Sequence, residues 1–190
     1  SRGLGDVYKR QQINSMKIIF ALIALILLTS CSGNNMKPID FKDQKPRLII
    51  EEYMSGYVKA WGILQNRSGK VTRQFSADLN GTWDGKQLIL DEKFIWNDGE
   101  IQTRQWKINK IDEHNYEGTA GDVVGTAKGY SYGPAFKFEY VLLVPVKGRE
   151  MKITFDDWIF MQDERVAINR ATMTKFGIKV AELTVVFVKD

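Results

Sequence analysis

Side chains that could carry out covalent or acid–base chemistry are few in this chain of 190 residues. It contains one histidine, His114, and one cysteine, Cys31. A catalytic triad or a Cys–His pair needs a histidine beside the nucleophile, and His114 lies in the polar stretch "DEHNY", where we expect a solvated turn. Zinc sites need clusters of His and Cys, which the sequence lacks. Adjacent Asp156 and Asp157 would point to opposite faces of a strand. We therefore expect no catalytic residue, no metal, no cofactor and no enzymatic activity.

Two acid–arginine pairs are the stronger candidates for a site: Glu92 with Arg104, and Asp157 with Arg170. A carboxylate buried beside a guanidinium stays charged and can form paired hydrogen bonds. Such a pair either satisfies itself and fixes strand register, or lines a cavity and offers its arginine to an anionic head group. Which of these holds depends on the strands that position the side chains.

The chain beyond Gly56 has the pattern of an all-β protein. Segments rich in Val, Ile, Phe, Tyr, Trp and Thr alternate with short clusters of Gly, Asn and Asp, which is typical of a sandwich or barrel. The spacing predicts an antiparallel up-and-down β-barrel of eight to ten strands over residues 47–190, with a short helix within Leu48–Met54. We expect the last strand, "IKVAELTVVFVK", to pair with the first, "YVKAWGIL", because closure removes exposed sheet edges.

The first readable hairpin places one charged pair. Asn97-Asp98-Gly99 between "QLILDEKFIW" and "EIQTRQWKI" fits a three-residue loop with glycine in the left-handed position. This loop puts Glu92 opposite Arg104 and Leu90 opposite Trp106, whereas a two-residue Asp-Gly loop would put Leu90 opposite Lys107. The apolar match favours the three-residue loop and turns Glu92 and Arg104 toward the barrel interior.

The second hairpin, "DDWIFMQDERVAINR", predicts a similar arrangement. A turn at Asp163-Glu164 that pairs Met161 with Val166 sets Asp157 opposite Arg170 on an apolar face. A cavity around both pairs would be walled by aromatic side chains, unless these form an ordinary filled core; the candidates are Trp96 and Trp106, with Trp61, Trp83, Trp158, Phe94, Phe138 and Tyr140.

The N-terminal part resembles a bacterial lipoprotein leader. Met16-Lys17 precedes an apolar run, Ile18–Leu28, too short to span a bilayer and suited to a signal peptide. Leu28-Thr29-Ser30-Cys31 resembles a lipobox, which implies cleavage before Cys31 and acylation of its sulfur. The alternative is a free or buried cysteine behind an ordinary export signal. We expect a signal peptide at residues 16–30 and an acylated tether at 31–46.

The lipobox resemblance also implies a location. A serine rather than an aspartate follows Cys31, which in this lipoprotein class favours the periplasmic face of the outer membrane. Residues 1–15 contain "DVYKRQ", which resembles a translated sequencing adapter. We interpret this segment as an artefact; a genuine disordered extension is the alternative.

The charge balance argues against nucleic acid as a partner. The chain has 27 basic and 23 acidic residues, but residues 1–30 hold four of the basic ones and a single acidic one. The remainder is nearly neutral and has no basic run interleaved with aromatics, so the electrostatic pattern of a nucleic-acid-binding protein is missing. A single cysteine excludes an intramolecular disulfide.

Several stretches of the chain together resemble one family. "WGILQNRSGKVTRQF", "GTWDGKQLILDEKFIWNDGEIQTRQW", "DVVGTAKG" and "FDDWIFMQDERVAINRATMTKFG" are similar to the bacterial lipoprotein family called domain of unknown function 3833. The resemblance runs from about Tyr57 to Lys189. It implies a lipocalin-like barrel, assigns no catalytic residue, and favours a fatty acid or phospholipid as ligand.

Two functions follow as hypotheses. The first is a monomeric, lipid-anchored barrel that binds a hydrophobic small molecule through Arg104, Glu92, Arg170, Asp157, Trp106 and Trp96. The second is a structural or partner-binding envelope lipoprotein with a filled barrel. A cavity would favour the first, and a contiguous exposed apolar patch the second.

Overall fold

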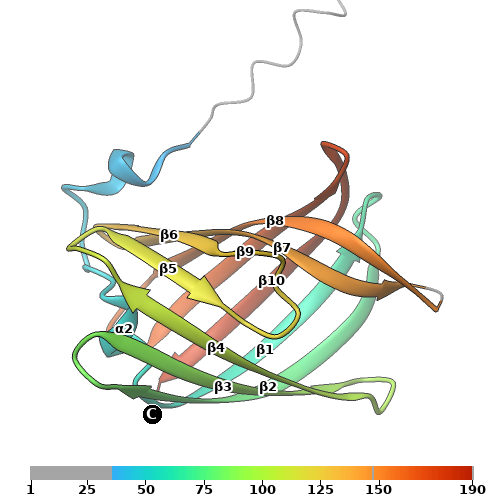
Figure 1. Cartoon of the computed structure of the whole chain (residues 1–190), viewed down its shortest axis with the longest axis horizontal. Coiled ribbons are helices and arrows are strands. Elements are labelled where there is room, and N and C mark those ends of the chain that lie inside the picture. Colours follow the sequence, from blue (N-terminus) through green and yellow to red (C-terminus); the bar gives the residue numbers. More distant parts are fainter. Residues whose placement is uncertain (1–35, 147, 190) are drawn as a thin grey trace, which may run out of the picture. The chain divides into compact units, whose positions relative to one another are not determined.

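The computed structural model describes residues 36–146 and 148–189, which form a closed antiparallel barrel of ten strands (Figure 1). Each strand pairs with the next along the chain, and β10 pairs with β1 to close the cylinder. The predicted all-β, up-and-down barrel is therefore confirmed. The predicted artefact at 1–15, the signal peptide at 16–30 and the lipidation site Cys31 lie outside the described residues.

Ten strands and two short helical segments make up this region. The elements are η1 (Pro38–Phe41), α2 (Ile50–Tyr53), β1 (Gly56–Asn66), β2 (Val71–Trp83), β3 (Gln87–Trp96), β4 (Ile101–Lys110), β5 (Asn115–Thr119), β6 (Ala127–Tyr132), β7 (Ala135–Val146), β8 (Arg149–Met161), β9 (Val166–Lys175) and β10 (Ile178–Lys189). The helix expected within Leu48–Met54 is α2.

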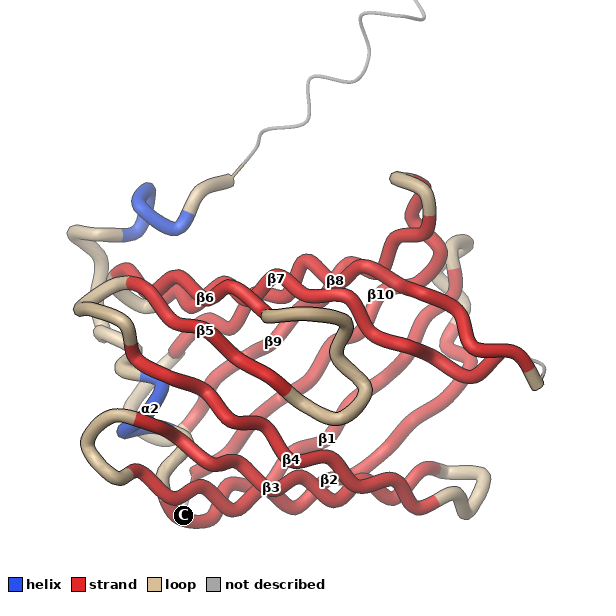
Figure 2. The backbone as a smooth tube through the Cα atoms, viewed as in Figure 1, coloured by secondary structure: helices blue, strands red, loops and turns tan. Residues whose placement is uncertain are grey.

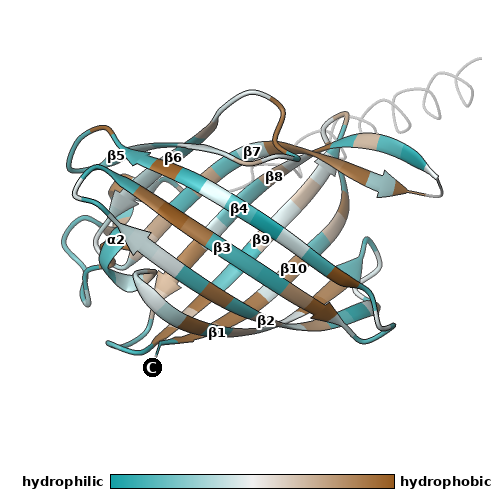
Figure 3. Ribbon diagram, turned by 60° about the horizontal axis from the view of Figure 1, so that its bottom comes forward, coloured by the Kyte–Doolittle hydropathy of each residue, from teal (hydrophilic) through white to brown (hydrophobic). Residues whose placement is uncertain are grey.

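Alternating side chains build the core. Along β2, Phe75, Ala77 and Leu79 are buried while their neighbours are more exposed, and Figure 3 shows the matching alternation of hydropathy along the strands. Glycine permits close packing inside: a Cβ on Gly62 would lie 2.3 Å from the Phe75 ring. The period of two thus directs one face of each strand inward.

The helix α2 closes one end of the barrel. Ile50 and Met54 are 2% exposed, and the carbonyl oxygen of Met54 packs so tightly on β2 that a Cβ on Gly81 would lie 1.9 Å from it. The Tyr53 hydroxyl donates to the main-chain oxygens of Arg165 at 2.9 Å and Phe187 at 3.2 Å. We call this the closed end; the hairpins β1–β2, β3–β4, β7–β8 and β9–β10 turn at the opposite, open end.

The segment 37–46 packs on the outside of the barrel. The Phe41 ring lies 6.1 Å from the Trp158 ring and 5.4 Å from the Phe160 ring. A Cβ on Gly133 would lie 2.0 Å from the Phe41 carbonyl oxygen. This part of the predicted tether therefore belongs to the folded domain, because aromatic residues on the outer face of β8 need a cover.

The two predicted hairpin registers have different outcomes. In the first, Glu92 pairs with Arg104 and Leu90 with Trp106, as predicted. In the second, Asp157 pairs with Ala171 and Met161 with Ala167, one residue away from the prediction.

The cause of the one-residue difference is a turn that is one residue longer than the predicted two-residue turn at Asp163-Glu164. Gln162 N–H donates to the Val166 oxygen at 2.8 Å, which leaves a three-residue loop. The Asp163 carboxylate accepts from the main-chain N–H groups of Arg165 and Val166, both at 2.8 Å. Because a one-residue slip exchanges the faces of a strand, Asn169 and Ala171 point inward and Arg170 points outward. The prediction that Arg170 faces the interior is wrong.

One sector of the wall is completed by a loop instead of strands. Strand β5 pairs with β4 only as far as Lys107, and β6 pairs with β7 only as far as Glu139. Toward the open end, the loop 120–126 lies between β4 and β7 (Figure 2). An isolated bridge between Val123 and Leu142 holds this loop to β7. The Leu143 N–H also donates to the main-chain oxygen of Asp122 at 2.9 Å.

Candidate ligand-binding site

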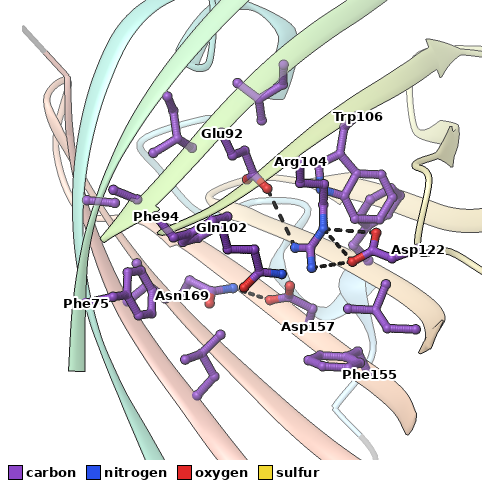
Figure 4. A pocket seen from close by; sticks show the side chains of 18 of the residues that line it. Phe75, Glu92, Phe94, Gln102, Arg104, Trp106, Asp122, Phe155, Asp157 and Asn169 are labelled. Carbon is purple, nitrogen blue, oxygen red and sulfur yellow. Dashed lines mark hydrogen bonds and ion pairs between the residues drawn. The ribbon is translucent and has the colours of Figure 1, made fainter. Parts of the chain in front are cut away.

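The barrel encloses a cavity of about 310 Å³. Its innermost part is lined by Ile50 and Met54 of the closed end, and toward the open end it reaches Glu100 and Pro145. Most of the lining is apolar and comes from the inward faces of the strands, including Phe75, Ala77, Leu79, Leu90, Phe94, Phe136, Phe138, Leu142, Phe155, Ile159, Met173, Leu183, Val185 and Phe187. A polar cluster from β3, β4, β8, β9 and the loop 120–126 interrupts this surface (Figure 4).

Arg104 is the centre of this cluster. Its Nε lies 3.1 Å and 3.0 Å from the two carboxylate oxygens of Asp122, and one terminal nitrogen lies 2.7 Å from Asp122 Oδ2. Nη1 lies 3.6 Å from Glu92 Oε2, within ion-pair range but beyond a hydrogen bond. Burial disfavours the guanidinium charge, but Glu92 and Asp122 outweigh it and raise the pKa of Arg104. Asp122 is thus the main partner, a residue that the sequence analysis missed.

Glu92 is the least satisfied member of the cluster. Its side chain is 13% exposed, and Oε2 accepts no hydrogen bond from the described residues. Burial raises the pKa of Glu92 to about 7, and Asp157 and Asp122 add to this effect while Arg104 opposes it. The carboxyl group is therefore partly protonated near neutral pH, with one oxygen free to accept a donor inside the cavity.

Asp157 forms a second polar group across the cavity. Its Oδ2 accepts from the Tyr140 hydroxyl at 2.9 Å, and its Oδ1 accepts from the side chain of Asn169. Burial raises the pKa of Asp157 to about 6 although both hydrogen bonds act against the shift. Asp157 points inward as predicted, but its predicted partner Arg170 does not. The partner that the sequence analysis missed is Asn169, which is 3% exposed.

Arg170 lies on the outer surface of the barrel. Its side chain is 68% exposed and pairs with Glu182 of β10. It makes no contribution to the cavity, because the register of β9 turns it away.

The tryptophans divide between the two faces of the wall. Trp96 and Trp106 line the cavity as expected. Trp106 packs against Phe138 with ring centroids 5.1 Å apart, and Arg73 lies over the Trp96 ring at 4.0 Å. Trp61 is 50% exposed on the outside, and Trp158 is covered by the outer segment 37–46, so neither is a cavity wall.

The charges in the cavity favour some ligands over others. The Arg104 guanidinium faces the three carboxyl groups of Glu92, Asp122 and Asp157, and Asp122 already engages it through Nε and one terminal nitrogen. A carboxylate or phosphate group would have to displace Asp122 and approach two further acids. The polar cluster is therefore better suited to a ligand group that donates hydrogen bonds than to an anionic head group.

Other kinds of site find little support in the part of the chain that is described. Residues 36–146 and 148–189 contain no group of three His, Cys, Asp or Glu side chains arranged to hold a metal ion. None of the helices in the same residues has the length and apolarity needed to cross a membrane.

The sequence places the chain in a family. Residues 25–189 match the family described as "Protein of unknown function (DUF3833)", and the chain belongs to it, as the resemblance predicted. No functionally curated protein has detectable sequence similarity to the chain.

Solved structures show that the fold is lipocalin-like. The barrel is similar to the S-type phycobiliprotein lyase CPES from Guillardia theta, with 10% identity, a TM-score of 0.55, and 74% of this chain and 90% of the lyase covered. It is also similar to a protein of unknown function from the DUF3598 family of Nostoc punctiforme, with 13% identity and a TM-score of 0.58. That alignment covers 77% of this chain and 51% of the other. At such identities the similarity shows the fold alone.

Proposed function

We propose that this member of the DUF3833 family binds a hydrophobic small molecule, such as a lipid, inside its barrel. The observation that carries the proposal is the cavity of about 310 Å³ with mostly apolar walls. Pockets for small ligands commonly have volumes of about 300–1,000 Å³ and combine apolar walls with a few placed polar groups. The alternative, a structural lipoprotein with a filled barrel, does not account for this space.

The polar cluster favours a particular polar end on the ligand. Oε2 of Glu92 has no hydrogen-bond donor among the described residues and is free to accept one, whereas Arg104 is occupied by Asp122. A hydroxyl, amide, ammonium or protonated carboxylic acid group would complete the cluster, and an ionised carboxylate would meet repulsion from the acids. A fatty acid fits in its neutral form. Below about pH 7 the Glu92 carboxyl is itself mostly protonated, because its pKa is raised to about 7.

We also propose that the protein acts as a monomer at the cell envelope, on the periplasmic face of the outer membrane, anchored through an acylated Cys31. The support is the lipobox-like sequence before Cys31. The binding is proposed to involve no chemical conversion, since the described residues that line the cavity include carboxyl groups and the arginines Arg73 and Arg104 but no serine, cysteine or histidine.

The test begins with the full chain purified in a mild detergent. Native mass spectrometry and organic extraction should reveal an apolar molecule bound at about one per chain. Leu183 lines the cavity on β10, so Leu183→Trp should fill the space and strongly reduce the bound amount. Val186 on the same strand is 36% exposed, so the matched change Val186→Trp should leave binding unchanged. Equal binding by both variants, or no ligand in any preparation, would contradict the proposal.

A second measurement tests the polar end. At pH 8 a fatty alcohol should displace a fluorescent apolar probe more effectively than the ionised fatty acid of equal chain length. The difference should shrink as the pH falls and the acid is protonated. Tighter binding of the ionised acid at pH 8 would show that Arg104, not Glu92, sets the preference.

A further inference from the structure

The hairpin between β9 and β10 carries an aromatic residue that the fold does not use. Phe176 is 93% exposed at the tip. Its φ is +52°, and Gly177 follows with φ +75°. Both central positions of such a turn favour Gly, Asn or Asp, and a bulky residue there is strained. Strain of this kind at an exposed position suggests a contact outside the fold.

This tip is also only loosely tied to the strands beside it. Strand β10 pairs with β1 only as far as Ala181, and β9 pairs with β8 only as far as Thr174. Beyond these points the hairpin is held only by the pairs Lys175–Ile178 and Thr174–Lys179, with a register shift at Val180, and the tip projects at the open end (Figure 1). Ile178 is 55% exposed and Val180 36%. Three large apolar side chains are thus presented on one projecting hairpin.

The tip itself carries only basic residues, and the nearest acids at the open end are already paired: Glu182 with Lys179, and Asp98 and Glu100 with Arg73. The sequence from Thr174 to Val180, TKFGIKV, contains two lysines and no acid. The neighbouring hairpin tip, residues 66–70, reads NRSGK and also contains two cations and no acid. Lys175 lies over the Phe176 ring, with Nζ 5.3 Å from its centroid. Exposed apolar residues flanked by cations match the surface of an anionic bilayer, where each basic residue adds to the attraction.

We propose that the open end of the barrel docks on an anionic lipid surface, with the tip of β9–β10 inserted among the lipids. Other exposed apolar residues surround the same end, on the ends of β2, β3, β4 and β7, namely Val71, Ile95, Ile101 and Val146. In this orientation Phe176 and Ile178 enter the apolar layer while Lys175 and the cations of residues 66–70 meet the phosphates.

Docking also has a consequence for the cavity, which rests on the proposed ligand-binding function. Met173, three residues before Phe176, lines the cavity. A ligand could then pass between the lipid layer and the barrel without crossing water. The docking itself needs neither the ligand nor Cys31.

The experiment uses the full chain with Cys31→Ser, which removes the predicted acylation site and the only cysteine. A single cysteine is then introduced by Ile178→Cys and labelled with an environment-sensitive fluorophore. The matched control is Glu164→Cys, which places the label in an exposed turn at the closed end. With vesicles containing phosphatidylglycerol, the label at 178 should shift to the blue and the label at 164 should not. Pure phosphatidylcholine vesicles should give a much smaller shift.

Two further variants identify the contributing groups. In the chain labelled at 178, Phe176→Ser should weaken vesicle binding by roughly tenfold or more, because the apolar ring no longer leaves water for the lipid layer. Lys175→Glu should weaken binding to the anionic vesicles and have little effect with the neutral ones. Equal shifts at 178 and 164, or no shift at either, would overturn the proposal. A blue shift of the label at 178 that appears without vesicles when the protein concentration is raised would also overturn the proposal, since it would indicate contact between two copies of the chain. Loss of docking with intact ligand binding would leave the proposed function standing.

Discussion

Two buried glutamates show how differently the two parts of the barrel interior are built. At the closed end, Glu51 accepts from Lys110 Nζ and, at 2.9 Å, from the Tyr116 hydroxyl. Burial works to raise the pKa of Glu51, but these hydrogen bonds outweigh it and hold the pKa below the ordinary value. In the cavity, Glu92 has a guanidinium 3.6 Å away and an oxygen without a donor, and burial raises its pKa to about 7.

The difference separates stability from binding. A buried carboxylate with its hydrogen bonds complete supports the fold, as Glu51 does where α2 meets β4 and β5. A buried carboxylate left incomplete costs stability and is retained where something else completes it. Glu92 fits the second description, which is why we assign the cavity, and not the closed end, to the ligand.

The largest expected effect comes from removing Arg104, the cation at the centre of the polar cluster. Arg104→Leu leaves Glu92 and Asp122 without a counter-charge, and breaking such a pair costs about 3–5 kcal/mol of unfolding free energy. The matched change Arg170→Leu removes an exposed ion pair on the outer face and should cost at most about 1 kcal/mol. Urea unfolding followed by tryptophan fluorescence measures both. Similar losses in the two variants would show that the cavity pair is solvated.

A second pair of variants tests the two glutamates directly. Glu51→Gln takes the counter-charge from Lys110 and should lower the unfolding free energy at pH 8 by about 1–3 kcal/mol. Glu92→Gln should raise it by an amount of the same order. The opposite signs follow from the opposite pKa shifts.

The pH profile distinguishes these effects from simple packing changes. The folded chain keeps a proton on Glu92 up to about pH 7, whereas the unfolded chain releases it near the ordinary value of 4.5. The unfolding free energy therefore falls as the pH rises from about 4.5 to about 7, and Asp157 adds a similar decline up to about pH 6. Glu92→Gln should flatten the upper part of this decline. A profile identical to that of the parent chain would contradict the assignment.

The first hairpin shows how far sequence could go. Gly99, with φ +87°, occupies the left-handed position that a three-residue loop requires, so the register of β3 and β4 followed from a visible residue. The turn between β8 and β9 contains no glycine. Its register is fixed by the Asp163 carboxylate, which accepts from two main-chain N–H groups, and the predicted pairing of Met161 with Val166 was therefore one residue out of register. Small inward residues, Ala167 and Ala171, occupy the face that larger ones were expected to fill.

The missing partners of the cavity pairs have a similar explanation. Asn169 enters the cavity as a consequence of the β9 register, so it could not be found without that register. Asp122 lies on a loop that completes the wall by an isolated bridge. No periodic pattern marks such a residue, and its contact with Arg104 depends on the shortness of two strands, β5 and β6.

The smallest expected effect is on the stability of the β9–β10 tip, where vesicle binding and unfolding free energy are expected to change in opposite directions. Asn accepts a positive φ more readily than Phe, so Phe176→Asn should raise the unfolding free energy by about 1 kcal/mol. At the next position, Gly177→Ala introduces a Cβ at φ +75° and should lower it by a similar amount. Urea unfolding measures both, and vesicle binding of the same proteins is measured alongside. A gain in stability with weaker vesicle binding means that Phe176 is retained for contact with lipid at the expense of the fold. A loss of stability in Phe176→Asn would mean instead that the ring supports its own hairpin, and the strained turn would no longer argue for docking.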